Sequence, residues 1–196
     1  MKNPCPGLWL PDIQEQTKHL TSLTNNLITL SRMEEERTRL QMIDFPFSDV
    51  VEETVQSFQA LASTQNKTFN TSIQPMISLH GDEKSLTQLV SILLDNAMKY
   101  STPEGEISLR LEKAGNNVKL SVYNTAESID REQLPHPFDR FYRTDKSRNS
   151  RTGGYGIGLS IAAAVVNAHK GKITATTQDE HSLLITVTLP LKTQGR

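Results

Sequence analysis

The chain has 196 residues, of which 36% are hydrophobic, and a formal net charge of −1, which allows one compact domain with an appendage. The balanced charge, without a concentrated basic block, argues against nucleic acid or an anionic membrane as a partner. A single cysteine, Cys5, excludes an intrachain disulfide framework. No apolar run approaches the roughly 20 residues that span a bilayer, so we expect a soluble, cytoplasmic protein.

Within residues 1–42, a long helix is predicted from Pro11-Asp12, with Asp12 as N-cap, to near Leu40. An apolar seam with alternating spacings of three and four runs for about three heptads. Its positions are Ile13, Gln16, Leu20, Leu23, Leu27, Leu30, Glu34 and Arg37. Because so narrow a seam on one helix needs a partner, we expect self-association or bundle formation. The alternative is that the helix folds back on its own domain.

The pattern becomes globular in residues 43–196. Three helices are predicted: residues 48–65, a helix from an Asp82 N-cap to about Tyr100, and a helix that ends near His169-Lys170 with Gly171 as its stop. A short helical piece is predicted at 138–143, and strands at 67–73, 106–113, 117–124, 172–178 and 182–189. Gly115-Asn116-Asn117 is a hairpin signal. The mixture indicates the α+β class, with one sheet covered by helices on one face.

Three segments carry candidate binding chemistry, and the first is the glycine run from Gly153 to Ala162, GGYGIGLSIA, with four glycines in six positions. Glycine lets the backbone approach a ligand closely. A helix that starts there offers free N–H groups and the positive end of its dipole. The run therefore predicts a phosphate-binding loop that leads into a helix. The alternative is an ordinary glycine-rich turn.

The other two segments add polar groups suited to a nucleotide. Asn96 and Lys99 are three residues apart and share a helix face. An amide oxygen suits Mg²⁺, a lysine reaches phosphate, and Tyr100 can lie against a base or ribose. Arg140 and Arg143 offer forked donors to phosphate, ahead of a polar loop long enough to close over a ligand. The alternatives are surface residues at a helix end and an ordinary solvated loop.

Four segments, taken in chain order, resemble the four ATP-binding boxes of sensor histidine kinases, which belong to the gyrase, Hsp90, histidine kinase and MutL superfamily. The segments are LLDNAMKYS, VYNTAESID, FDRFYRTDK and GGYGIGLSIA. The resemblance implies a two-layer α/β sandwich of the Bergerat type, with a mixed sheet, that binds ATP and Mg²⁺ under a lid. It makes Asn96 the Mg²⁺ ligand. The implied nucleotide contacts are Asn96, Lys99, Tyr100, Asn124, Ala126, Ile129, Arg140, Arg143, Gly154, Tyr155, Gly156, Ile157, Gly158 and Leu159.

The first glycine box departs from the family pattern Asp-x-Gly-x-Gly, because it reads Asn124-Thr125-Ala126-Glu127-Ser128. The Asn124 oxygen can accept from the adenine amino group but lacks charge assistance, a loss of roughly 1 kcal/mol. If Ala126 and Ser128 required a positive φ, each would cost about 1 kcal/mol. We therefore predict weakened, not abolished, adenine binding.

Ile92 is a second departure, because the superfamily's hydrolases carry a glutamate there as general base. Isoleucine cannot activate water. This disfavours a gyrase-like ATPase and suits an enzyme whose nucleophile is a protein side chain.

The segment LITLSRMEEERT resembles the second helix of the family's dimerisation and phosphotransfer hairpin, which assigns residues 1–42 to that helix and 43–196 to the catalytic domain. No histidine has the context of the family's phosphoacceptor; the five are His19, His80, His136, His169 and His181. We therefore expect transfer of the ATP γ-phosphate to a histidine absent from this chain, which alone should not autophosphorylate. The implied partners are a response regulator, the phosphoacceptor-helix domain of the same or another kinase, and a second copy in a homodimer.

Two alternatives remain: a nucleotide-binding module without phosphotransfer, and a serine kinase of the anti-sigma type. The heptad helix disfavours the second of these. In the intact protein this portion is expected on the cytoplasmic side, with a membrane anchor elsewhere.

Overall fold

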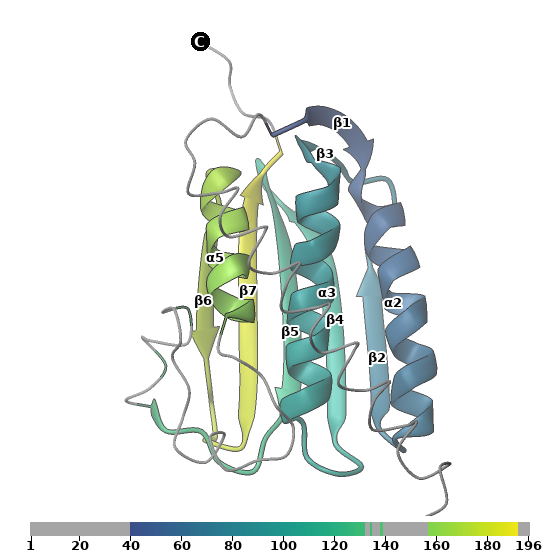
Figure 1. Cartoon of the computed structure of the whole chain (residues 1–196), viewed down its shortest axis with the longest axis vertical. Helices are drawn as coiled ribbons and strands as arrows, with labels where there is room; N and C mark the ends of the chain where they lie inside the picture. Colours follow the sequence, from purple (N-terminus) through teal and green to yellow (C-terminus); the bar gives the residue numbers. More distant parts are fainter. Residues whose placement is uncertain (1–39, 132–133, 135–137, 139–156, 192–196) are drawn as a thin grey trace, which may run out of the picture. The chain divides into compact units, whose positions relative to one another are not determined.

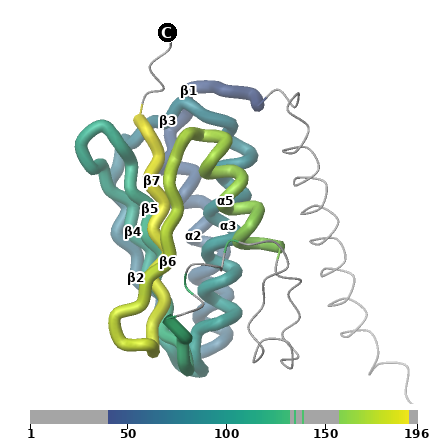
Figure 2. The backbone as a smooth tube through the Cα atoms, turned by 90° about the vertical axis from the view of Figure 1, so that its left-hand side faces the viewer, coloured from purple at the N-terminus to yellow at the C-terminus, as the bar shows by residue number. Residues whose placement is uncertain are grey.

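The computed structural model describes residues 40–131, 134, 138 and 157–191. Within these ranges, three helices cover one face of a mixed sheet (Figures 1 and 2). The predicted α+β class and the one-sided helical cover are confirmed. Four predicted features lie outside the described residues: the N-terminal helix, the helical piece at 138–143 apart from Phe138, the polar loop at 144–152, and the glycines before residue 157.

The main sheet has the strand order β2-β4-β5-β7-β6. Its strands are β2 (Thr68–Ile73), β4 (Glu106–Ala114), β5 (Asn117–Thr125), β7 (Ser182–Pro190) and β6 (Lys172–Thr176). β2 runs parallel to β4, and the other neighbours are antiparallel. Both predicted hairpins are present, and Gly115 has a φ of +62° at the first position of its two-residue turn.

Strands β1 (Met42–Pro46) and β3 (Ser78–Asp82) form a separate antiparallel pair. The sequence did not predict either strand. Each has only five residues, and Pro46 and Gly81 are residues that normally interrupt strands.

The helical layer consists of α2 (Phe47–Thr64), α3 (Glu83–Tyr100) and α5 (Gly158–Ala168). Alternate residues of the three central strands point into it, as the period of two requires. These buried side chains are Ile107, Leu109, Leu111, Val118, Leu120, Val122, Ile185, Val187 and Leu189. No helix in the described ranges is long and apolar enough to cross a membrane.

The helix ends show one confirmed prediction and one that is wrong in detail. Asp82 caps α3, since its side chain accepts a hydrogen bond from Ser85 N at 2.8 Å. After α5, however, Lys170 and not Gly171 adopts the left-handed φ, at +56°. Gly171 is needed for packing instead, because a Cβ there would lie 2.6 Å from Thr188 O. The glycine lets the chain turn back closely against β7.

Candidate functional site

Helices α3 and α5 lie side by side and run in opposite directions, so the start of each lies by the other's later residues (Figure 1). At one end, His169 after α5 contacts Asp82 before α3. Toward the other end, a Cβ on Gly158 would lie 3.5 Å from Cγ2 of Ile92. The start of α5 therefore lies against α3 one turn before Asn96.

The last two turns of α3 carry three of the predicted site residues. Asn96 and Lys99 are half-buried, and Tyr100 is 39% exposed. The Lys99 ammonium lies 5.3 Å from the centroid of the Tyr100 ring, within the range of a cation–π contact. This end of the helix presents an amide, a cation and an aromatic ring.

Lys67, which the sequence analysis did not identify, holds the end of α3 in place. Its Nζ donates to Met98 O at 2.6 Å, to Ser101 O at 3.2 Å and to the Ser101 hydroxyl. A cation at this position satisfies carbonyls that a helix C-terminus leaves unpaired and complements the helix dipole. Burial lowers the pKa of Lys67. No local pattern marks a lysine before a strand as the partner of a helix end whose Met98 carbonyl lies 31 residues later.

Asn124 lies at the end of β5 and is 2% exposed. Its Nδ2 donates to Thr125 O at 2.8 Å, so Oδ1 is the amide atom that remains as an acceptor. The Thr125 hydroxyl shares a hydrogen bond of 3.0 Å with the Thr102 hydroxyl and accepts from Glu106 N at 3.1 Å. The end of β5 is thus anchored to the loop that follows α3.

The altered glycine box is folded without the strain considered for it. Neither Ala126 nor Ser128 has a positive φ, so the penalty of about 1 kcal/mol each does not arise. Ala126 N donates to His181 O, and Ile129 N donates to Glu180 O, both at 2.7 Å. The backbone donors of these two residues are therefore used within the chain.

The N-terminus of α5 has no side-chain cap from its own N-cap residue. Ile157 occupies the N-cap position and provides no side-chain hydrogen bond to the helix. Its carbonyl accepts from Ser160 Oγ at 2.8 Å and from Ile161 N at 3.1 Å. The first amides of the helix, at Gly158 and Leu159, receive no hydrogen bond from the Ile157 side chain and lie at the positive end of the helix dipole. This arrangement can bind an anion such as phosphate.

His169, another residue whose role the sequence analysis did not identify, is 5% exposed at the opposite end of the α3–α5 pair. Its Nδ1 donates to Val165 O at 2.8 Å, and its Nε2 accepts from Asp82 N at 3.0 Å. Both ring nitrogens are therefore engaged in holding the two helices together, and this histidine has no nitrogen left for phosphotransfer.

Five predicted site residues lie outside the described ranges: Arg140, Arg143, Gly154, Tyr155 and Gly156. Among the described residues, no group of three or more His, Cys, Asp or Glu side chains could hold a metal ion. The half-buried Asn96 amide still fits Mg²⁺, because this ion is usually bound by one or two protein oxygens together with phosphates and water.

Residues 81–193 match the family described as histidine kinase-, DNA gyrase B-, and HSP90-like ATPase. Sensor protein DltS of Streptococcus agalactiae serotype III is 31% identical over 192 residues, which cover 97% of this chain and 48% of that protein. The signal transduction histidine-protein kinase BaeS of Escherichia coli K12 is 31% identical over 180 residues, with coverage of 92% and 38%. The chain spans about half the length, or less, of these relatives.

Solved structures support the fold. Histidine kinase AdeS of Acinetobacter baumannii superposes with a TM-score of 0.74 at 23% identity, covering 98% of this chain and 88% of that one. The nucleotide-free catalytic domain of histidine kinase ThkA gives 0.67 at 22% identity, with coverage of 77% and 96%. ThkA in complex with response regulator protein TrrA gives 0.76 at 21% identity, with coverage of 99% and 55%.

Proposed function

Since the chain belongs to the family of histidine kinase-, DNA gyrase B- and HSP90-like ATPases, we propose that it is the catalytic portion of a two-component sensor kinase. In this proposal the γ-phosphate of Mg-ATP passes to a histidine on a phosphoacceptor helix, and then to an aspartate of a response regulator. The observation that carries the proposal is that the start of α5 and the end of β5 both lie beside the later half of α3, which carries Asn96.

Each described residue has a role suited to its chemistry. The Asn96 amide would hold Mg²⁺, which when bound neutralises charge on the phosphates. Lys99 and the uncapped amides of α5 would contact the phosphates, and Tyr100 would face the sugar. Asn124 Oδ1 would accept from the adenine amino group. The chain contributes position and electrostatics, which dominate phosphoryl transfer.

Ile92 supports transfer to a protein side chain rather than to water. It lies one turn before Asn96 and packs toward Gly158. An aliphatic side chain cannot serve as the general base that hydrolysis of ATP requires. The proposed product is therefore phosphohistidine, not free phosphate.

Labelled ATP, incubated with this chain and a separate polypeptide that bears the family's phosphoacceptor helix, tests the proposal. We expect label on the histidine of that helix, and its loss with Asn96→Ala. Asn167→Ala, which removes an exposed amide from α5, is the matched control and should retain transfer. Nucleotide binding without transfer would instead favour the alternative of a binding module.

The proposal also includes partners that the described domain does not contain. A response regulator is proposed as the final acceptor, in line with the ThkA–TrrA complex of a protein that shares the fold. The predicted first helix is proposed to mediate a homodimer on the cytoplasmic side of the membrane. A strictly monomeric sedimentation profile at high protein concentration would count against the dimer.

A further inference from the structure

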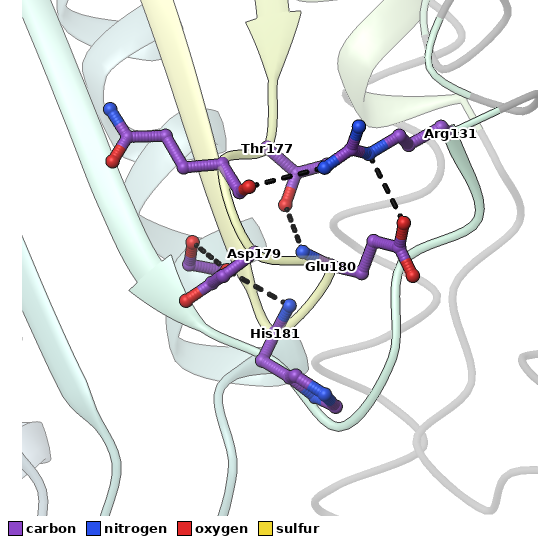
Figure 3. A network of polar contacts seen from close by, with 7 residues as sticks. Arg131, Thr177, Asp179, Glu180 and His181 are labelled. Atoms are coloured by element: carbon purple, nitrogen blue, oxygen red, sulfur yellow. Dashed lines mark hydrogen bonds and ion pairs between the residues drawn. The ribbon is translucent and has the colours of Figure 1, made fainter.

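The turn between β6 and β7, residues 177–181, contacts the segment 126–131 that follows β5. Figure 3 shows Arg131 of this segment beside the turn. Two backbone hydrogen bonds join them, from Ala126 N and Ile129 N to the carbonyls of the turn. The His181 Nδ1 also donates to Glu127 O at 2.8 Å. We refer to these residues as the β6–β7 turn and the 126–131 segment.

Arg131 adds the remaining contacts between the two. Its Nη2 donates to Gln178 O at 3.1 Å, and its Nε lies 3.2 Å from Oε1 of Glu180. The ion pair is well exposed and contributes little to stability by itself. With the bond to Gln178 O, however, it fixes Arg131 across the turn.

The β6–β7 turn has its own internal order. Asp179 Oδ1 accepts from His181 N at 2.9 Å and from Ser182 Oγ at 2.6 Å, and these hydrogen bonds lower the pKa of Asp179. Glu180 N donates to Thr177 Oγ1 at 3.1 Å, although Glu180 has an unusual φ of +61°. These internal hydrogen bonds fix the conformation of the β6–β7 turn, which in turn holds the 126–131 segment in place.

The 126–131 segment begins two residues after Asn124, the side chain proposed to recognise the adenine amino group. The segment carries Ala126 and Ser128 where glycines are expected, and its conformation is fixed by the β6–β7 turn. We infer that the β6–β7 turn positions the purine side of the nucleotide site, with His181 and Arg131 as positioning residues. This inference rests on the proposed nucleotide-binding function.

The difference between ADP and GDP affinity distinguishes a positioning role of the β6–β7 turn from a general contribution of the turn to folding. Adenine offers an amino group to the Asn124 oxygen, whereas guanine presents a carbonyl at the same ring position. Displacement of the 126–131 segment should therefore weaken ADP and leave GDP almost unchanged. A loss of folded protein would instead weaken both nucleotides by the same factor.

The test compares the double variant R131M/H181F with R110M/H80F in the full chain. The control also removes one arginine and one histidine that have acidic partners at the surface, the half-exposed Glu112 and the exposed Asp44. Displacement of a fluorescent nucleotide gives the Kd of ADP and GDP, and amide hydrogen exchange reports on the N–H groups of Ala126 and Ile129. Thermal unfolding verifies that each variant is folded. R131M alone replaces the double variant if the latter does not unfold cooperatively.

We expect R131M/H181F to weaken ADP about five- to tenfold and GDP less than twofold, with faster exchange at both amides. The control should change none of these quantities. Unchanged ADP affinity, or an equal loss for ADP and GDP, would overturn the inference while the proposed function stands. Failure of the unaltered chain to bind ADP at millimolar concentration would overturn both.

Discussion

The two ends of the α3–α5 helix pair are built differently. Where α3 begins, Asp82 caps the helix, His169 uses both ring nitrogens, and Gly81 leaves no room for a side chain. Where α5 begins, the N-cap Ile157 gives the first amides no side-chain hydrogen bond, and Asn96 on α3 is half-buried. The first end is completed by the chain itself, and the second presents donors and acceptors that suit a ligand. The difference separates the end that stabilises the fold, called here the structural end, from the end at which we propose that nucleotide binds.

Replacement of His169 should be the most severe test of the structural end. His169→Leu leaves Asp82 N without its buried acceptor and removes the donor to Val165 O, so we expect a loss of about 3 kcal/mol in the free energy of unfolding. Urea unfolding measures it. His80→Leu, at an exposed histidine, should cost far less. Equal losses of unfolding free energy in the two variants would show that the buried His169 hydrogen bonds do not stabilise the protein more than an exposed histidine does.

A pair of glycine substitutions sharpens the same contrast. A Cβ on Gly81 would lie 2.8 Å from Leu86 Cδ1 and 2.9 Å from His169 Cδ2, so Gly81→Ala should destabilise by about 2 kcal/mol. Among the residues that the structure describes, a Cβ on Gly158 meets only Ile92, at an ordinary 3.5 Å. Gly158→Ala should therefore change stability by less than about 0.5 kcal/mol and weaken ADP at least about fivefold. A stable G158A protein with full ADP affinity would contradict the binding role of this end.

These contrasts also show what could be predicted from the sequence. Helix α3 was predictable because the Asp82 cap and the apolar period are local signals. Lys67 and Ser101, which are in contact, lie 34 positions apart in the sequence. Arg131 and Glu180, which form an ion pair, lie 49 positions apart. Such pairs depend on strand order and register, which no local pattern records. Strands β1 and β3 were missed for the same reason, since each is stabilised mainly by pairing with the other.

Lys67 gives the proposed binding end an internal hydrogen-bond donor as well, because it satisfies carbonyls at the end of α3 that carries Lys99 and Tyr100. Lys67→Met removes the donor to Met98 O and Ser101 O and should cost about 1 kcal/mol. It should also weaken ADP, since Lys99 and Tyr100 lie in the released turn. Urea unfolding and ADP titration measure the two effects. Lys119→Met, on the half-exposed surface of β5, is the control; an equal result for both variants would refute the role of Lys67.

The smallest effect is expected in the pH dependence of the structural end. Burial alone would raise the pKa of Asp82, but hydrogen bonds from Ser85 and Gln41, together with the His169 ring, hold it below the ordinary value of 3.8. A carboxyl with a lowered folded pKa stabilises the protein above its unfolded pKa, and this contribution is lost as the pH falls through the folded value. Urea midpoints between pH 5 and 2 should therefore fall less steeply in Asp82→Asn than in the unaltered chain. Parallel curves of urea midpoint against pH for the two proteins would contradict a stabilising contribution of the ionised Asp82 carboxylate.

The central proposal is that the end of the α3–α5 pair where α5 begins binds a magnesium–adenine nucleotide. Calorimetric titration with ADP, with and without Mg²⁺, tests it most directly. We expect saturable binding that Mg²⁺ strengthens in the unaltered chain, and loss of the Mg²⁺ effect in Asn96→Ala but not in Asn167→Ala. Absence of ATP or ADP binding at millimolar nucleotide would contradict the claim, as would a Mg²⁺ effect that persists in Asn96→Ala.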